Sequence, residues 1–472
     1  MSLAELLVEH PFSDDEDLLH SIDRSLTAGQ TRREAATLAS QLRAAGVGAG
    51  HPVAVQLSDA LDSVVAMFAV WLAGGVLLPL NPRATAVEVA DVLDAISPAV
   101  VLNDGGLERR DGARALTEDA AFVLWTSGTT GRPKAVLHTH TAYMELLDRV
   151  LISLRQGAAT GATERGKRHT PNIVPVSLAL NAGIYNVLFG LRSGAAVVVM
   201  DRFDPVTFAM LIRRFQIRST VLPPAAMTML CDDERIDDLA PLRYVRSITA
   251  PLSPVQARRF ADTFGITVLN GYGQAEIGEV IGWTAADARA HPEKIGAVGR
   301  PHAGVELRLV GDDGRAVTDG GVGELYVRPP SMATGYADGS SIGERLDADG
   351  FVRTGDLART DPDGFVWIEG RVGDVINRGG NKVFPDHVEE VLRLSPRVAD
   401  AAVVGVPDDR LGEVPVAFVV GDATSDELDA LCREHLVAYK VPVAFHHVDV
   451  LPRSEVGKVL RRELLARAEV RS

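Results

Sequence analysis

Cysteine is scarce in this sequence. Its 472 residues contain only Cys231 and Cys432, which lie far apart and outside any C-x-x-C pair. A disulfide framework or a thiolate zinc site needs several cysteines at short spacings. The sequence therefore predicts neither, and we expect a protein of the reducing cytoplasm.

Positive charge is also in short supply. The chain has 48 Lys and Arg against 63 Asp and Glu, which gives a formal net charge of -15. Proteins that bind nucleic acid along its backbone need a basic face. We therefore expect no nucleic-acid partner, and any nucleotide binding must be local.

Export and membrane signals are absent or weak. Residues 1–10 lack a basic region followed by a long apolar region, so no export signal is expected. Residues 63–82 carry no charge and are long enough to suggest a membrane span. However, Gly74, Gly75 and Pro79 divide them into a helix-length and a strand-length piece, which predicts a buried helix followed by a strand.

The chain is longer than one hydrophobic core usually supports, so at least two domains are expected. Helical and strand-like apolar segments alternate from about residue 32 to residue 264, which predicts mostly parallel sheets with helices on both faces. From Val305 short strands and turns predict a β-rich subdomain, and the chain after Gly373 predicts a small α+β unit. Two polar stretches, residues 103–117 and 155–170, are expected to be surface loops.

One loop stands out for its small residues. After the apolar run of residues 121–125 comes Thr126-Ser127-Gly128-Thr129-Thr130-Gly131-Arg132-Pro133-Lys134. Small side chains let backbone amides close around an anion, so the composition indicates a phosphate-binding loop. The Walker spacing is absent. For the loop taken alone, a plain surface turn remains the alternative.

Four further motifs follow the loop in a fixed order. They are Tyr272-Gly273-Gln274-Ala275-Glu276, Arg353-Thr354-Gly355-Asp356, Gly370-Arg371-Val372-Gly373-Asp374 and Pro452-Arg453-Ser454-Glu455-Val456-Gly457-Lys458. With the loop, they resemble the adenylate-forming superfamily of acyl-CoA synthetases, luciferases and peptide-synthetase adenylation domains. The resemblance runs from Ala73 to the end of the chain. It implies an N-terminal adenylate-forming domain over residues 1–372 and a mobile C-terminal domain over residues 373–472.

The resemblance also implies roles for individual residues. ATP would adenylate a carboxylic acid with Mg²⁺ present, and coenzyme A would then accept the acyl group. Glu276 would hold Mg²⁺, Asp356 would accept the ribose hydroxyls with Arg371 nearby, and Lys458 would bridge the carboxylate and the α-phosphate. The remaining nucleotide-binding residues would be Thr126, Ser127, Gly128, Thr129, Thr130, Lys134, Ala250, Pro251, Asn270, Gly271, Tyr272, Gly273, Gln274 and Ala275. Each acid or base taken singly has a solvated surface role as its alternative.

Departures from the family pattern leave the acid and the acceptor open. Ala275 stands where threonine is common, and Leu178 where many CoA synthetases carry histidine. No acid lies in residues 177–181, which disfavours an amino acid substrate, and no cation lies in residues 178–182, which favours an apolar or aromatic acid. A carrier-protein thiol, an amine as acceptor, an oxyacid such as nitrite as substrate, or a binding-only protein with a degenerate site remain alternatives.

Overall fold

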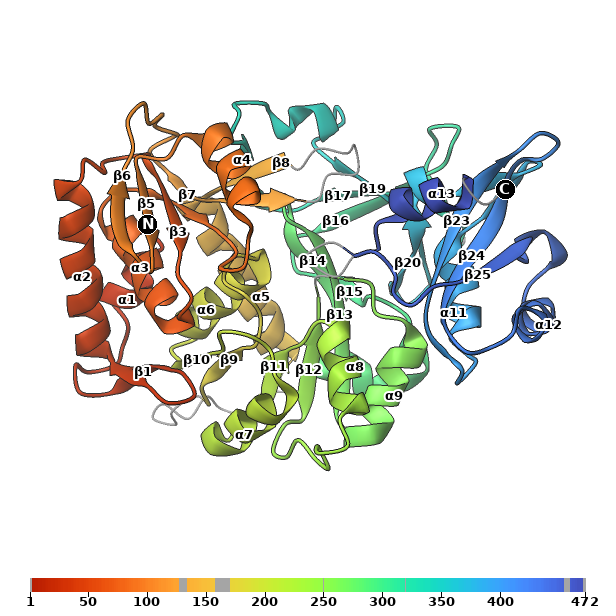
Figure 1. The fold of residues 1–472 in the computed structure, drawn as a ribbon, viewed down its shortest axis with the longest axis horizontal. Helices are drawn as coiled ribbons and strands as arrows, with labels where there is room; N and C mark the ends of the chain where they lie inside the picture. Colours follow the sequence, from red (N-terminus) through yellow and green to blue (C-terminus); the bar gives the residue numbers. More distant parts are fainter. Residues whose placement is uncertain are drawn as a thin grey trace.

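The computed structural model describes residues 2–126, 134–157, 170–248, 250–318, 320–453 and 459–469, which form five sheets. Four sheets belong to the N-terminal part of the chain, and one lies at the opposite end with the C-terminus (Figure 1). The α/β fold with a smaller α+β unit is thus as the sequence predicts.

A seven-stranded sheet has a parallel centre and antiparallel edges. In spatial order it contains β18 (Gly335–Tyr336), β8 (Lys134–Thr139), β7 (Ala120–Thr126), β4 (Val76–Pro79), β3 (Pro52–Gln56), β5 (Val100–Asn103) and β6 (Gly106–Arg109). Strand β6 corrects the sequence prediction, which made residues 103–117 a loop. A turn at Asp104 and Gly105 folds the chain back, and β6 pairs antiparallel with β5 as an exposed edge strand, so it needs no apolar pattern.

Two further sheets build the rest of the large α/β part. The first runs β2 (Ser25–Thr27), β1 (Asp17–His20), β10 (Val197–Val199) and β9 (Asn172–Val174). The second runs β11 (Ser219–Val221), β12 (Tyr244–Ser247), β13 (Thr267–Gln274), β14 (Gly278–Gly282) and β15 (Arg300–Pro301). In the second sheet β11, β12 and β13 are parallel, whereas β13 and β14 form an antiparallel hairpin.

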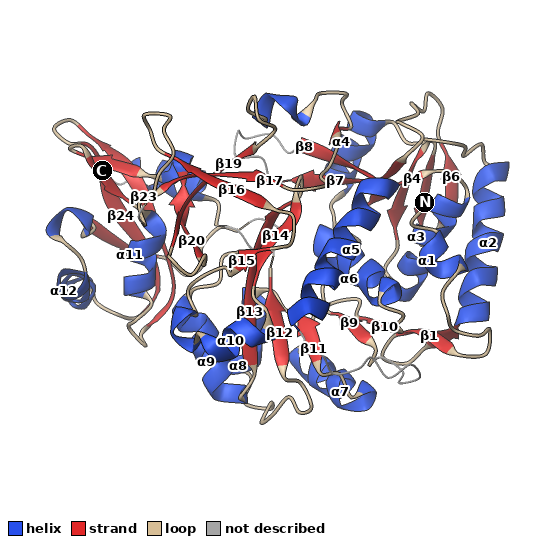
Figure 2. Cartoon of the chain, turned by 180° about the vertical axis from the view of Figure 1, so that it is seen from behind, coloured by secondary structure: helices blue, strands red, loops and turns tan. Residues whose placement is uncertain are grey.

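Helices cover these sheets on both faces (Figure 2). They are α1 (Glu5–Val8), α2 (Ala28–Ala44), α3 (Ala60–Leu72), α4 (Ala86–Ile96), α5 (His140–Gly157), α6 (Asn181–Arg192), α7 (Pro205–Phe215), α8 (Pro224–Asp232), α9 (Pro254–Phe264) and α10 (Ala285–Ala290). Helix α3 is buried almost throughout and β4 follows it, so the predicted helix and strand within residues 63–82 are confirmed. In the part of the chain that the structure describes, no helix is long and apolar enough to cross a bilayer. Helix α5 extends to Gly157, which corrects the predicted loop at residues 155–157, whereas residues 158–169 of that prediction lie outside the described ranges.

The β-rich subdomain is an antiparallel sheet of β16 (Glu306–Val310), β17 (Gly323–Arg328), β19 (Val352–Thr360) and β20 (Val366–Arg371). The C-terminal sheet contains β22 (Asn381–Val383), β21 (Ile376–Arg378), β24 (Gly412–Gly421), β23 (Val398–Asp408) and β25 (Ala444–His447). It packs with α11 (Pro385–Leu392), α12 (Ser425–His435) and α13 (Arg461–Glu469) around cores of its own. Gly373, the expected boundary, lies in a short 3₁₀ turn, Val372–Asp374, between β20 and β21.

Candidate active site

The site is organised by the β13–β14 hairpin, which lies in the middle of the molecule between the N-terminal sheets and the C-terminal sheet (Figure 1). Gly273 has to be glycine, because a Cβ atom there would come within 2.1 Å of the Gly278 carbonyl oxygen. Gly278 has a φ of +65°, which also favours glycine. The tight hairpin directs the side chains of Tyr272 and Gln274 toward β19.

Asp356 on β19 is the centre of the contacts on this side of the hairpin. It is only 4% exposed. Its Oδ2 accepts hydrogen bonds from the Tyr272 hydroxyl at 2.5 Å and from Gln274 Nε2 at 2.8 Å. Its Oδ1 lies 2.9 Å from Nε of Arg371, which is its register partner on β20. Burial raises the pKa of Tyr272, and the Asp356 charge raises it further, so the phenol remains a donor.

An arginine that the sequence analysis did not single out connects Asp356 to Glu276. Nη1 of Arg345 lies 2.7 Å from Oε1 of Glu276, and Nη2 donates to Oε1 of Gln274 at 2.7 Å. Gln274 in turn donates to Asp356. These residues form one continuous group, here called the carboxylate cluster: Tyr272, Gln274, Glu276, Arg345, Asp356 and Arg371.

The loop that the sequence predicts to bind phosphate connects β7 and β8. Thr126 ends β7, Lys134 begins β8, and the two are paired across the strands. The Lys134 ammonium lies 4.9 Å from the centre of the Tyr336 ring, whose hydroxyl is 3.4 Å from Oε1 of Glu276. The loop residues between them, including Ser127, Gly128, Thr129 and Thr130, lie outside the described residues.

The remaining predicted nucleotide residues surround the same hairpin. Ser247 at the end of β12 is paired with Asn270 on β13, and the half-buried Ala250 and the exposed Pro251 come after β12 in the chain. Asn270 accepts a hydrogen bond from the Gly271 amide at 3.0 Å. Ala275 packs against Tyr336. By contrast, Leu178 lines a separate, mainly apolar pocket with Met67, Met200 and Asp201, away from the carboxylate cluster.

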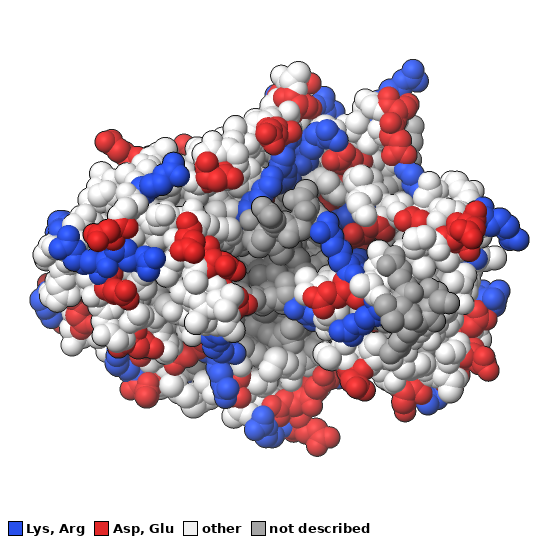
Figure 3. Space-filling model, turned by 45° about the horizontal axis from the view of Figure 1, so that its top comes forward, with Lys and Arg blue, Asp and Glu red and all other residues white. Residues whose placement is uncertain are grey.

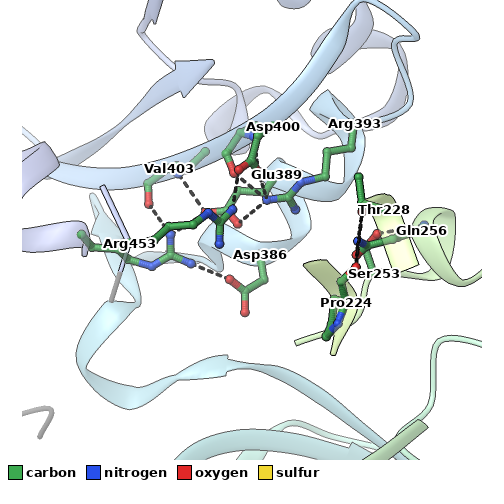
Figure 4. A network of polar contacts seen from close by, with 12 residues as sticks. Pro224, Thr228, Ser253, Gln256, Asp386, Glu389, Arg393, Asp400, Val403 and Arg453 are labelled. Carbon is green, nitrogen blue, oxygen red and sulfur yellow. Dashed lines mark hydrogen bonds and ion pairs between the residues drawn. The ribbon is translucent and has the colours of Figure 1, made fainter. Parts of the chain in front are cut away.

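Lys458 lies outside the described residues, but the structure shows how both flanks of residues 454–458 are held. Arg453 and Val459 form an antiparallel bridge, and the Leu460 amide donates to the Pro452 carbonyl at 2.9 Å. Arg453 also pairs with Asp400 on β23, in the polar network of Figure 4. Arg461, which follows Leu460 and begins α13, contacts Asp386 and Glu389 on α11. The flanks of Lys458 are therefore fixed to the C-terminal unit.

A Mg²⁺ ion in a nucleotide site usually takes one or two protein carboxylates together with substrate phosphates and water. The described residues contain no group of three or more His, Cys, Asp or Glu side chains that could hold a metal by themselves. Glu276, beside Lys134 and Tyr336, fits the pattern of a single carboxylate that shares the ion with phosphates. Figure 3 shows a hollow on the face that it draws, between the large part and the C-terminal part, with acidic and basic side chains around its rim.

Three contributors were missed by the sequence analysis. Arg345 ends a 3₁₀ turn that follows Ser341, and nothing in its local sequence marks it. Tyr336 is placed by β18, a strand of two residues. Thr354 lies inside a quoted motif: its hydroxyl donates to the Leu325 carbonyl at 2.6 Å and accepts from the Asp356 amide at 3.1 Å, which fixes the backbone beneath Asp356.

Comparisons with known proteins give a consistent result. The family model described as "AMP-binding enzyme" matches residues 10–116 and 107–337, and that of the "AMP-binding enzyme C-terminal domain" matches residues 387–458. The chain is 32% identical to 4-coumarate–CoA ligase-like 9 of Oryza sativa subsp. japonica, over 93% of this chain and 87% of that protein. It is 30% identical to sulfoacetate–CoA ligase of Cupriavidus necator, over 94% and 93%. The structure of the amide bond synthetase McbA from Marinactinospora thermotolerans superposes with a TM-score of 0.84 at 28% identity, over 98% and 99% of the two chains.

Proposed function

Because the chain belongs to the AMP-binding enzyme family, we propose that it is an AMP-forming acid–CoA ligase that uses ATP to activate a carboxylic acid. The carboxylate cluster carries this proposal. It offers a buried anion, Asp356, that is suited to ribose hydroxyls. A second carboxylate, Glu276, is linked to Asp356 through Gln274 and Arg345. Tyr336 contacts both Glu276 and Lys134. Asp356 can therefore bind the ribose of a nucleoside triphosphate, and Glu276 with Lys134 can bind its phosphate end.

In the first half-reaction, a carboxylate oxygen of the acid attacks the α-phosphorus of ATP, and the bond to pyrophosphate breaks. Catalysis of this kind depends mainly on positioning and on neutralising charge. Asp356, held by Tyr272 and Gln274, orients the ribose, and Lys134 with its loop binds the phosphates. Glu276 holds Mg²⁺, which when bound offsets the negative charge of the phosphates. Lys458 bridges the acid and the α-phosphate.

In the second half-reaction, the CoA thiol attacks the carbonyl carbon of the adenylate and AMP leaves. Lys458 has to withdraw before the thiol can approach. We assign this movement to a rotation of residues 373–472 about Gly373, which brings the face that carries Arg378, Gly379 and Gly380 toward the site. Gly373 suits a hinge because a Cβ there would meet no atom within 4 Å and the residue has no side chain to clash during rotation.

The acid is proposed to have an apolar or aromatic chain. Residues 178–182 carry no charge that could pair with a charged acyl chain. The relatives are named for differing acids, an aromatic one in rice and a sulfonated one in C. necator, so membership alone does not select one.

The test is pyrophosphate release, measured with ATP and Mg²⁺ across a panel of aromatic, alkyl and amino acids, with and without CoA. We expect acid-dependent release, and formation of an acyl thioester when CoA is present. An amine or a carrier-protein thiol that supported turnover where CoA did not would replace the acceptor in this proposal. ATP binding without pyrophosphate release for any acid would refute ligase activity altogether.

A further inference from the structure

A second group of polar side chains is buried on the opposite face of the β13–β14 hairpin. Successive residues of a strand point to opposite faces, so Gly271 and Gly273 face away from the side on which Tyr272 and Gln274 contact Asp356. A Cβ atom on Gly271 would lie 3.2 Å from Oε1 of Glu279. Glu279 on β14 is therefore separated from the carboxylate cluster by only the thickness of one strand.

Six residues make up this second group, here called the buried arginine cluster. They come from α5, α6, β12, β14 and the segment after β15, and α5 packs against both α6 and β14 (Figure 2). The members are Arg149, Tyr185, Arg246, Ser247, Glu279 and His302, and each is inside the protein or nearly so. Arg246 pairs with Oε1 of Glu279, and His302 Nε2 is 3.2 Å from the same oxygen.

The charges in the buried arginine cluster do not balance. Burial opposes ionisation of Glu279, but the Arg246 charge and the His302 contact outweigh it, so the pKa of Glu279 lies below its ordinary value. That one anion is already paired with Arg246. Arg149 remains as a second cation, and among the described residues no carboxylate forms an ion pair with it. Burial lowers the pKa of Arg149 by more than the charges of Tyr185, Glu279 and Glu145 raise it. A buried cation without an anion is costly.

Arg149 also lacks hydrogen-bond acceptors. It is 6% exposed, and its hydrogen bonds run from Nη1 to Ser331, at 3.2 Å to Oγ and 3.5 Å to the carbonyl oxygen. Among the described residues nothing accepts from Nε or Nη2. The buried hydroxyls of Tyr185 and Ser247 likewise have no hydrogen-bond partner among the described residues. In the same cluster, Oε2 of Glu279 is an acceptor that receives no hydrogen bond from a described residue. The unsatisfied groups are therefore mostly donors.

The charge of Arg149 acts on the Tyr185 hydroxyl of the buried arginine cluster. Burial raises the pKa of the Tyr185 hydroxyl, the Glu279 charge raises it further, and Arg246 and Arg149 oppose the rise, so all three charged side chains lie near this phenol. The hydroxyl stays protonated and can donate. A ligand group that fits here is an anion with several acceptor oxygens.

We propose that the buried arginine cluster recognises a second anionic group, a carboxylate or a sulfonate, at the far end of the acid that this enzyme activates. The inference rests on the proposed function and narrows its substrate class: an apolar or aromatic chain with one carboxylate at the nucleotide and an anion at Arg149. Residues 178–182 contain no cation, whereas Arg149 on α5 and Arg246 on β12 come from distant parts of the chain and meet only in the fold.

The experiment uses pairs of acids of increasing length, alkyl and phenyl, that differ only in a terminal methyl or a terminal carboxylate. For each pair, kcat/KM is measured from acid-dependent pyrophosphate release. A hydrogen bond to a charged group changes a binding constant by about 10- to 150-fold compared with a complex in which that bond is not formed. We expect the dicarboxylate to exceed its methyl partner by that factor at one chain length, and we expect Arg149→Met to abolish this preference. Arg192→Met, which removes a half-exposed arginine on α6 paired with Asp148, is the matched control and should keep the preference.

The outcomes separate the inference from the proposed function. Release with methyl-ended acids but with no preference for a dicarboxylate of any length would overturn the inference and leave the ligase in place, with the cluster as internal structure. A preference that survives in Arg149→Met would overturn it too. The absence of release with every acid tested would refute the ligase instead. If Arg149→Met does not fold, Tyr185→Phe serves in its place: loss of one donor should reduce the preference several-fold, and an unchanged preference counts against the inference.

Discussion

Replacing Asp356 with asparagine should weaken nucleotide binding while leaving the fold intact. The carboxylate has two oxygens that accept, and three donors already use them: Tyr272 and Gln274 on Oδ2, and Arg371 on Oδ1. The asparagine side chain would keep one oxygen and place an amide, itself a donor, against one of these groups. The amide should face Arg371, because the Arg371 side chain is 36% exposed and can be hydrated again, whereas Tyr272 is only partly exposed.

The magnitude follows from this geometry. In the variant, the ribose hydroxyls meet a neutral acceptor in place of an anion, and a hydrogen bond to a charged group contributes about 1.5–3 kcal/mol. The dissociation constant for AMP should therefore rise about 10- to 150-fold. The free energy of unfolding should fall by about 1–3 kcal/mol, the cost of leaving one buried partner unsatisfied.

Calorimetric titration with AMP measures the effect without any acid or CoA, and thermal unfolding measures the stability. Asp349→Asn is the matched control, since Asp349 is an exposed carboxylate that pairs with Arg308 outside the cluster. Unchanged AMP affinity in Asp356→Asn, with a folded protein, would refute the assignment of Asp356 to the ribose.

Four further outcomes are expected. Lys458→Ala should depress adenylation about 10²- to 10³-fold while sparing thioester formation from a supplied acyl adenylate, and equal loss in both half-reactions would contradict its role. Gly373→Pro should keep one half-reaction, adenylation, and lose the other, because proline fixes φ near roughly -65°; normal turnover would place the hinge elsewhere. Arg461→Leu removes one of the two arginines that pair with the buried Glu389, Arg393 being the other, and should cost about 1–3 kcal/mol in unfolding free energy. Arg433→Leu, which removes an exposed pair with Asp429, should stay within about 0.5 kcal/mol, and similar effects of the two would refute the difference. Burial lowers the pKa of His138 from 6.5 to about 3, so between these pH values the unfolded chain binds a proton that the folded chain does not. The free energy of unfolding should therefore fall as the pH drops from 6.5 toward 3. An equally steep fall in His138→Gln would contradict this assignment.

The fold was largely accessible from the sequence because its signals are local. The alternation of strand and helix patterns, the glycine pair that separates α3 from β4, and the change to short strands near Val305 each depend on residues close together in the chain. Edge strand β6 was missed for the complementary reason. An exposed strand pairs through its backbone and carries no apolar pattern, so its polar residues are typical of a loop as well.

Some residues of the candidate site could be predicted from the sequence and others could not. The resemblance to the adenylate-forming superfamily implied that Glu276, Asp356 and Arg371 serve one nucleotide site, and in the structure these three side chains lie in one cluster. The position of Lys458 relative to that cluster stays a prediction. Arg345 was not recognised, because its contacts are with Glu276 and Gln274, 69 and 71 positions away, and a lone arginine after a serine turn has no distinctive sequence.

By itself, then, the sequence determined most of the alternation of strands and helices, with edge strand β6 as an exception. Tertiary structure alone decided which charges meet. Arg149 and Ser331 are 182 positions apart, and Arg246 and Glu279 come from different strands, so no local pattern could pair them. The physical reason is that burial and electrostatics act through space: whether an arginine is a solvated surface charge or an unpaired cation beside a binding site depends on what the fold packs around it.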